Sequence, residues 1–296
     1  MAESAAVTRG DERPDDAPTT TISLSGGRRL RYAEYGRPDG TPVLFLHGTP
    51  GSHRLGSLFE TAARERGVRL LAPDRPGYGR STPWSERSIG DADQYLRAVL
   101  DDANVQRAGL VAFSGGAPHA LAMATRCPDA VSRVDLVAGA TPPDVSGETP
   151  TTQRLLGGLA TRTPTLLGGL LRGQAWLAER LDPSFVVAQY TAGDADEPVS
   201  EEVATTIEAD FLEALAHTTS GTVTELRTAA TEWALDYESL AADVCLWHGT
   251  ADTNVPIASV RAFEDRLPTA TIETVDGADH LRTLLRAVPA ALESYR

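Results

Sequence analysis

The sequence predicts an α/β fold, in which a mostly parallel sheet is flanked by helices and carries an inserted block of helices. Short apolar runs alternate with segments of helical periodicity in the first half of the chain, and this alternation resumes near the C-terminus. Between the two parts, no strand pattern appears over a stretch too long for a loop. We therefore expect residues 20–141 and 242–296 to form the core, residues 142–241 a helical cap, and the acidic residues 1–19 a flexible tail.

The composition and the net charge indicate which kinds of molecule this protein can bind. The chain of 296 residues can bury a large core, and no apolar run approaches the ~20 residues of a membrane-spanning helix. The formal net charge is −14, and all 27 basic residues are arginine. Such a charge repels nucleic acid and anionic membrane surfaces, so we expect a small-molecule substrate and neither of those partners. The acidic excess without lysine is typical of a salt-adapted or high-GC source, and a homo-oligomer stays open.

The cysteines and the N-terminus indicate a cytoplasmic protein. Cys127 and Cys245 lie far apart, without metal-ligand spacing or a disulfide framework, as expected in a reducing compartment. Residues 1–16 are polar and acidic and lack the basic and apolar regions of a secretory signal. No phosphate-binding glycine loop and no cluster of metal ligands is evident, so we expect no cofactor and no metal.

The first half of the chain supplies strands, helices and two loops with functional composition. Ser25-Gly26-Gly27 is a turn that joins the first two strands into a hairpin. The strand patterns cover residues 20–24, 30–35, 42–46, 68–72 and 110–113. Helical spacing covers residues 55–66 and 89–103, and the loops are His47–Ser52 and Asp74–Ser81.

A sharp turn follows the strand Leu110–Phe113. Gly115 and Gly116 come immediately after Ser114, and an alanine-rich helical stretch runs on to Thr125. A serine held between strand and helix in this way is typical of a nucleophile elbow. The backbone folds back at such a corner, so the neighbours two residues away must be small, as Ala112 and Gly116 are. By itself the pattern is also compatible with an ordinary turn.

The second half of the chain completes the sheet after the helical block. We expect strands over residues 133–138, 243–247 and 271–275, and helices over residues 155–181, 201–217, 222–233, 257–267 and from about Leu281 to the end. Within the block, the apolar run Leu155–Leu171 is compatible either with a lining for an acyl or alkyl group or with the core of the block itself.

Ser114, Asp252 and His280 follow three different predicted strands. Functional loops of an open parallel sheet gather at the carboxyl ends of its strands, so we expect these three side chains to meet there. They are separated by 138 (252 − 114) and 28 (280 − 252) residues. The order serine, acid, histidine distinguishes this arrangement from the two other known layouts of serine hydrolases.

With these motifs in place, the chain resembles the α/β-hydrolase superfamily, specifically its serine esterase- and peptidase-like branch with a helical cap. The resemblance covers nearly all of residues 20–296. It rests on five motifs, which are His47-Gly48-Thr49-Pro50-Gly51, the loop Asp74–Ser81, the elbow at Ser114, Gly249-x-x-Asp252 and Asp279-His280. The elbow departs from the commoner motif in having Ala112 where glycine is usual. The resemblance implies an α/β-hydrolase fold and the chemistry of a serine hydrolase.

The chemistry assigns a role to each residue. Ser114 is the expected nucleophile, His280 the general base and acid, and Asp252 the group that orients the imidazole. The backbone N–H of Gly115 faces the developing oxyanion, and the resemblance implies that the N–H of Thr49 is the second donor. We therefore expect hydrolysis of a carboxylic ester of a small to medium, largely apolar substrate through an acyl-enzyme.

Other activities and other residues stay open at this point. Proline iminopeptidase-like aminopeptidases, lactonases and cofactor-free haloperoxidases share parts of the pattern, whereas epoxide hydrolases and haloalkane dehalogenases resemble it with aspartate at the elbow. A catalytically inactive binding module is the alternative outside enzymes. Asp279 and Asp144 are alternative acids. Structural roles are expected for the remaining histidines, His47, His53, His119, His217 and His248, although His53 and His119 could border the pocket.

Overall fold

A single eight-stranded sheet forms the centre of the described chain. The computed structural model describes residues 17–145, 151–192 and 198–295. The strand order is β1-β2-β4-β3-β5-β6-β7-β8, with β2 antiparallel to β1 and β4 and the others parallel. The strands are β1 Thr19–Ser23, β2 Arg29–Gly36, β3 Thr41–Leu46, β4 Val68–Pro73, β5 Ala108–Phe113, β6 Val131–Val137, β7 Asp243–Gly249 and β8 Ala270–Val275. The predicted fold class is confirmed.

The predicted strand positions agree with this sheet to within two residues at each end. The hairpin turn at Ser25–Gly27 is also present, as one turn of 3₁₀ helix with Gly26 and Gly27 at positive φ. The predicted tail, residues 1–19, lies outside the described residues up to residue 16, and β1 already begins at Thr19.

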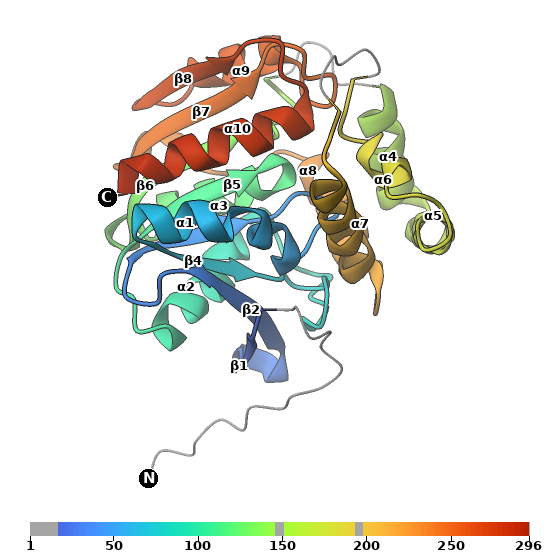
Figure 1. The fold of residues 1–296 in the computed structure, drawn as a ribbon, viewed down its shortest axis with the longest axis horizontal. Helices are drawn as coiled ribbons and strands as arrows, with labels where there is room; N and C mark the ends of the chain where they lie inside the picture. The colour runs from blue at the N-terminus through green and yellow to red at the C-terminus, as the bar shows by residue number, and fades with distance from the viewer. Residues whose placement is uncertain (1–16, 146–150, 193–197, 296) are drawn as a thin grey trace.

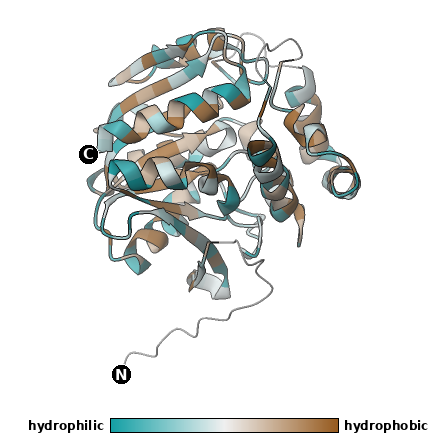
Figure 2. Ribbon diagram, in the orientation of Figure 1, coloured by the Kyte–Doolittle hydropathy of each residue, from teal (hydrophilic) through white to brown (hydrophobic). Residues whose placement is uncertain are grey.

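Helices cover both faces of the sheet (Figure 1), and alternating side chains of the central strands pack against them. Val43 and Phe45 of β3 belong to the core on one side, which includes helices α1 Glu60–Arg66 and α10 His280–Leu292. Leu44 and Leu46 belong to the core on the other side, with α2 Ala92–Asp102, α3 Ala117–Arg126 and α9 Ile257–Glu264. Burial on both faces explains why the strands appear in the sequence as continuous apolar runs. Helices α1 and α10 alternate polar and apolar residues (Figure 2).

One predicted helix of the core has a different form. Residues 55–66 were expected to form a single helix, but residues His53–Phe59 form a 3₁₀ helix and α1 begins only at Glu60. Gly56 lies against the ring of Tyr35, where a Cβ would approach the ring to 2.8 Å. Gly56 also disfavours an α-helix, and Ser57 has a lower helix propensity than alanine or leucine.

The described part of the inserted segment contains helices and no strand. These helices are α4 Thr151–Arg162, α5 Pro164–Ala178, α6 Ser184–Val187, α7 Glu201–Leu215 and α8 Ser220–Ala229. They lie together at one end of the molecule, on the right in Figure 1. The single helix expected over residues 155–181 is divided at Thr163, because Pro164 lacks the N–H that a helix interior needs and suits a first helical position.

The apolar run Leu155–Leu171 divides between interior and surface. Leu167 and Leu171 pack with Ala160 into a small core of the inserted helices. Leu155, by contrast, is 62% exposed, and other leucines of these helices are exposed as well. The run therefore forms in part the core of the inserted helices. In the described part of the chain, none of the helices has the length and apolar character required to cross a membrane.

Candidate active site

Ser114 lies at the carboxyl end of β5, in the middle of the sheet. All residues of β5 are buried, and the strand is paired on both sides, with β3 and β6. Ser114 has a φ of +49°, a conformation that residues other than glycine seldom adopt. The turn is tight, because a Cβ on Gly116 would lie 2.7 Å from the carbonyl oxygen of Leu46. The expected strand-turn-helix corner at Ser114 is present.

Asp252 and His280 meet at the ends of β7 and β8. The Nδ1 atom of His280 lies 2.7 Å from Oδ2 of Asp252, and both side chains are buried. The other carboxylate oxygen accepts hydrogen bonds from the N–H groups of Asn254 (2.8 Å) and Val255 (3.0 Å). Burial opposes ionisation of Asp252, but the hydrogen bond and the charge of His280 outweigh it and hold the pKa of this carboxyl below its usual value.

The imidazole of His280 lies beside the residue that precedes Ser114. Its ring centroid is 4.8 Å from that of Phe113 and 6.3 Å from that of Tyr190, which stacks on it at 9°. Among the described residues, no hydrogen bond joins the Ser114 hydroxyl to His280. Serine–histidine hydrogen bonds are often long in unliganded enzymes and tighten when substrate binds.

Thr49 and Gly115 lie next to each other beside Ser114. A Cβ on Gly115 would be 3.3 Å from the backbone nitrogen of Thr49 and 2.2 Å from its Oγ1, so only glycine fits at this position. Neither backbone N–H donates a hydrogen bond to any residue in the part of the chain that the structure describes. Two adjacent, unpaired backbone donors at a tight turn are suited to binding an oxyanion.

The two alternative acids have other partners. Asp279 caps the N-terminus of α10, where its carboxylate accepts the N–H of Arg282 at 2.8 Å and forms an ion pair with the Arg282 guanidinium. Asp144 is exposed and pairs with Arg266 at 2.5 Å. The structure thus brings Asp252, rather than Asp279 or Asp144, to the imidazole of His280.

The other histidines have structural partners or lie at the surface. His47 Nδ1 lies 2.8 Å from the carbonyl oxygen of Gly48, within its own loop. His53 contacts Asp74 at 2.9 Å, and His119 contacts Tyr95 and Glu225. His248 lies 2.8 Å from the carbonyl oxygen of Val255 and 3.6 Å from Asp252, a proximity that the sequence did not indicate. His217 is exposed.

Three side chains that could ligate a metal approach one another, namely His53, Asp74 and Glu213. Their charges already have protein partners. His53 contacts Asp74, and Glu213 pairs with Arg31 at 3.1 Å and with Arg54 at 3.7 Å. Two guanidinium groups beside the carboxylate would repel a cation, so we describe this group as an ion-pair cluster.

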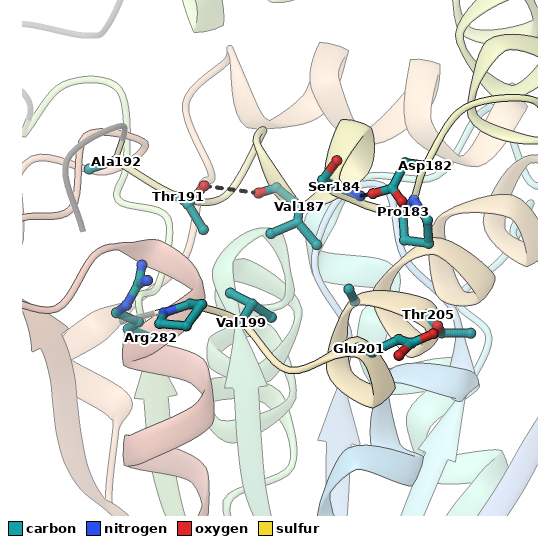
Figure 3. A pocket seen from close by; sticks show the side chains of 12 residues that line it. Asp182, Pro183, Ser184, Val187, Thr191, Ala192, Val199, Glu201, Thr205 and Arg282 are labelled. Atoms are coloured by element: carbon teal, nitrogen blue, oxygen red, sulfur yellow. Dashed lines mark hydrogen bonds between the residues drawn. The ribbon is translucent and has the colours of Figure 1, made fainter. Parts of the chain in front are cut away.

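A pocket of about 520 Å³ lies between α6, α7 and the start of α10 (Figure 3). Its described lining includes Val187, Val199 and Arg282, but not Ser114, Asp252 or His280. The pocket is adjacent to the candidate site through Ala192, whose N–H donates to Asp279 at 3.2 Å. It therefore lies beside the candidate site and does not contain the candidate catalytic side chains.

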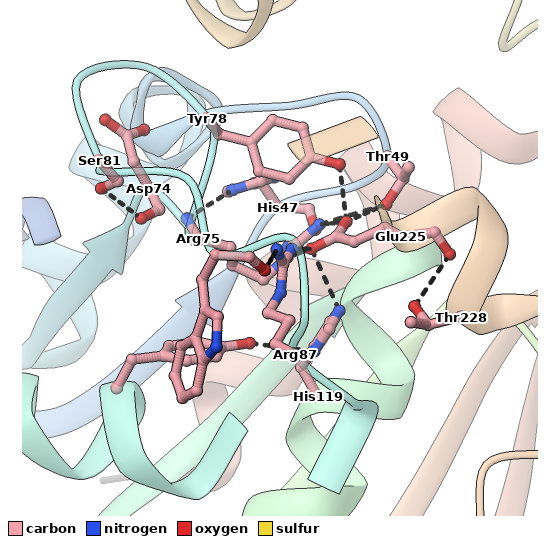
Figure 4. A network of polar contacts seen from close by, with 12 residues as sticks. His47, Thr49, Asp74, Arg75, Tyr78, Ser81, Arg87, His119, Glu225 and Thr228 are labelled. Atoms are coloured by element: carbon pink, nitrogen blue, oxygen red, sulfur yellow. Dashed lines mark hydrogen bonds and ion pairs between the residues drawn. The ribbon is translucent and has the colours of Figure 1, made fainter. Parts of the chain in front are cut away.

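Sequence reasoning missed a buried polar cluster around Glu225 (Figure 4). This residue of α8 is 3% exposed and contacts Thr49, Arg75 and His119, among others. Nothing in the local pattern indicates these contacts, since Glu225 and Arg75 are 150 residues apart. A charged residue among the small residues Gly221, Thr222 and Thr224 was the only available signal, and it is a weak one.

Comparison with known proteins gives a family match over most of the chain. A model of the alpha/beta hydrolase fold family matches residues 41–284. An uncharacterized hydrolase of Bacillus subtilis, YcgS, is 31% identical over 121 residues, which is 41% of each chain. A haloalkane dehalogenase of Mycobacterium marinum is 29% identical over 160 residues, which cover 53% of this chain and 52% of the dehalogenase. The chain thus spans about half or less of these relatives' length.

The fold is also similar to that of solved structures. A bromoperoxidase from Bacillus anthracis superposes with a TM-score of 0.73 at 20% sequence identity, covering 94% of this chain and 99% of the bromoperoxidase. At this identity the similarity concerns the fold alone.

Proposed function

Because the chain belongs to the α/β-hydrolase superfamily, we propose that it is a serine hydrolase that cleaves a carboxylic ester of a small to medium, largely apolar substrate. The observation that carries the proposal is one juxtaposition. A serine with positive φ follows Phe113 at the end of β5, the ring of Phe113 lies 4.8 Å from that of a histidine bonded to a buried aspartate, and two unpaired backbone donors adjoin the serine. These are the parts that acyl transfer through a serine requires.

In the proposed reaction, Asp252 accepts the Nδ1–H of His280 and leaves Nε2 to take the proton of the Ser114 hydroxyl. The serine oxygen attacks the ester carbonyl carbon, and the carbonyl electrons move to an oxygen that accepts the N–H groups of Thr49 and Gly115. When this intermediate collapses, His280 gives its proton to the departing alcohol. Water then attacks the acyl-enzyme by the same route and releases the acid.

The inserted helices support the proposal that residues 142–241 act as a cap. Tyr190, which follows α6, stacks on the imidazole of His280, and the carbonyl oxygen of Gln189 accepts the side-chain amide of Asn254 at 3.0 Å. The inserted segment therefore contacts both loops that carry the histidine and the aspartate. The rings of Tyr190 and Phe113 next to His280 favour an apolar group close to the reacting atoms.

Labelling with a fluorophosphonate tests the nucleophile. The wild-type protein is expected to be labelled, and Ser114→Ala is not, because the probe reacts with an activated serine. Equal labelling of both proteins would overturn the proposal and favour a binding module. A panel of p-nitrophenyl esters, lactones and aminoacyl anilides then identifies the acyl bond. Esters are expected to be the fastest substrates, and faster turnover of lactones or anilides would replace the ester assignment.

A further inference from the structure

Glu225 is a buried carboxylate with five side-chain partners from four separate segments of the core (Figure 4). It extends from α8 of the inserted segment, and its side chain is 3% exposed. Oε1 lies 2.8 Å from Nε of Arg75, 2.9 Å from Nη2 of Arg87 and 3.2 Å from Nε2 of His119. Oε2 lies 2.8 Å from Nη2 of Arg75 and 2.7 Å from both the Tyr78 hydroxyl and Oγ1 of Thr49.

Two arginines, Arg75 and Arg87, surround this buried carboxylate and neutralise its charge. The positive charges of Arg75 and the hydrogen bonds hold the pKa of Glu225 well below its usual value, although burial opposes this. Burial lowers the pKa of His119, and Glu225 opposes this shift through its charge and its hydrogen bond. Replacing a buried ion pair by well-packed apolar residues is often neutral or stabilising, so the ion pairs of Glu225 are weak evidence for a role in stability. The contacts of Arg75 show which part of the backbone lies next to this carboxylate.

Arg75 connects Glu225 to the backbone of the loop that follows β3. Its guanidinium also donates to the carbonyl oxygen of His47 and, from Nη2 at 2.9 Å, to the carbonyl oxygen of Gly48. The Gly48 carbonyl and the Thr49 N–H belong to the same peptide group. In a trans peptide these two bonds point in opposite directions. Because Arg75 holds the carbonyl, the Thr49 N–H points away from the cluster.

A second contact fixes the same residue. The hydroxyl of Thr49 donates to Oε2 of Glu225 at 2.7 Å and accepts from Nη2 of Arg75 at 3.2 Å. Thr49 is thus held by its preceding carbonyl and by its side chain, while its N–H has no partner among the described residues. Gly115 lies against Thr49, since a Cβ on Gly115 would be 2.2 Å from Oγ1 of Thr49 and 3.3 Å from its backbone nitrogen.

We propose that Glu225 is a positioning residue that sets the direction of the Thr49 N–H, so that the oxyanion hole is formed when α8 is packed against the core. The proposal rests on the proposed function, in which the Thr49 N–H stabilises the oxyanion. It assigns to the inserted segment a part in transition-state stabilisation in addition to contact with substrate. Glu225 itself touches no reacting atom.

Three substitutions test the proposal, one at Glu225 and two at Thr49. Glu225→Gln removes the charge that holds Arg75. Thr49→Val removes only the hydroxyl bonded to Glu225 and keeps a β-branched side chain, and Thr49→Ser restores the hydroxyl. Turnover of p-nitrophenyl butyrate is measured together with inhibition by an alkyl trifluoromethyl ketone. Ser114 adds to this ketone, its proton passes to His280, and the carbonyl oxygen becomes an oxyanion that the hole must bind.

Loss of a whole oxyanion-hole donor typically costs ~100- to 1000-fold in turnover, so a misdirected donor is expected to cost roughly 10- to 100-fold. We expect Glu225→Gln and Thr49→Val to lower kcat/KM and to weaken the ketone by similar factors, with KM nearly unchanged. Thr49→Ser keeps the hydroxyl that bonds Glu225, so we expect it to turn over the ester faster and to bind the ketone more tightly than Thr49→Val. A purely structural role would change the melting temperature without this parallel change.

Tyr295→Phe is the matched control, because it removes buried hydrogen bonds from a tyrosine hydroxyl to the carboxylate of Asp135 and to the carbonyl oxygen of Leu110, near the start of β5, whereas Ser114 follows the end of that strand. It should lower stability and leave ketone binding unchanged. Unchanged kcat/KM and ketone affinity in folded Glu225→Gln would overturn the inference. If that variant does not fold, the same result in Thr49→Val overturns it. Failure of the wild type itself to hydrolyse the ester or to react with the fluorophosphonate would instead overturn the proposed function.

Discussion

Ser114 and its neighbours show how single residues prepare the proposed chemistry. A residue other than glycine at φ +49° stores strain of about 1–3 kcal/mol, which the pairing of β5 with β3 and β6 can hold in place. The same corner carries the unpaired N–H of Gly115, so one turn supplies both the proposed nucleophile and one oxyanion donor.

The buried contact between Asp252 and His280 leads to a prediction for a single atom change. Asp252→Asn keeps the volume of the side chain but can donate to Nδ1, which favours the wrong tautomer of His280. We expect kcat for a p-nitrophenyl ester to fall about 10⁴-fold, with little change in the melting temperature. Asp144→Asn is the control, since Asp144 is exposed and paired with Arg266. A loss of less than tenfold in Asp252→Asn would contradict the role proposed for this aspartate.

Asp210 gives a second prediction at the residue scale, concerning pH. Burial raises its pKa to about 7, against two hydrogen bonds from Ser52, and the charge of Asp74 adds to the rise. The unfolded value is about 3.9. Between about pH 4 and pH 7 the folded state therefore binds more protons than the unfolded state, so this carboxyl makes the free energy of unfolding fall as pH rises through that window.

Asp210→Asn keeps an oxygen acceptor for Ser52 and removes the charge. We expect the variant to be more stable than the wild type at pH 8, by a margin that shrinks as the pH is lowered to 5, where the aspartic acid is neutral. Urea unfolding at the two pH values measures both margins. A difference in stability that is the same at pH 5 and pH 8 would show that Asp210 does not titrate between them.

At the scale of elements, the contact between α8 and the loop Asp74–Ser81 is the critical junction. The N–H of Gly221 donates to the carbonyl oxygen of Gly77 at 3.2 Å. Gly77 has a φ of +88°, and a Cβ on Gly221 would lie 2.6 Å from the Gly77 carbonyl oxygen. Both positions therefore need glycine. Glu225 follows one turn later on α8, so this close approach brings its carboxylate to Arg75.

Gly221→Ala is predicted to move α8 away from the core, because the new methyl group meets backbone that cannot yield easily. We expect a lower melting temperature and a loss of kcat/KM in the same direction as Glu225→Gln. Gly169→Ala is the matched control in another helix of the same segment, since a Cβ there meets nothing within 4 Å. Alanine favours a helix by ~1 kcal/mol over glycine, so the control should be as stable as the wild type or more stable. Equal behaviour of the two variants would contradict the importance of this junction.

At the scale of the whole molecule, the net charge of −14 lowers the free energy of unfolding, and salt weakens this effect. Self-repulsion among unpaired acidic groups destabilises the compact state, and it is screened as ionic strength rises. The buried ion pairs around Glu225 are screened much less. We expect the melting temperature to rise between 20 and 200 mM NaCl. The same change in KCl is the control, because screening depends on ionic strength and not on the cation. A fall in melting temperature would show that surface ion pairs dominate over repulsion.

The sequence predicts the fold more fully than it predicts the candidate site. Strand positions agree with the structure to within two residues, because the central strands are buried on both faces and appear in the sequence as apolar runs. Pro164 is a signal for a helix break, but the prediction of one helix over residues 155–181 ignored it, because the leucines on both sides continue the helical spacing. The loops carrying Ser114, Asp252 and His280 were located correctly at strand ends, while their catalytic roles stay predictions.

The sequence by itself determined the fold class, the order of the strands along the chain and the loops from which a site could be built. These features depend on hydrophobic patterns and turn residues that are close together in the chain. Only the tertiary structure decided that Asp252 rather than Asp279 reaches His280, and that Glu225 joins Thr49 to Arg75. Polar contacts of this kind connect residues 28 to 176 positions apart, and their geometry depends on how whole elements pack.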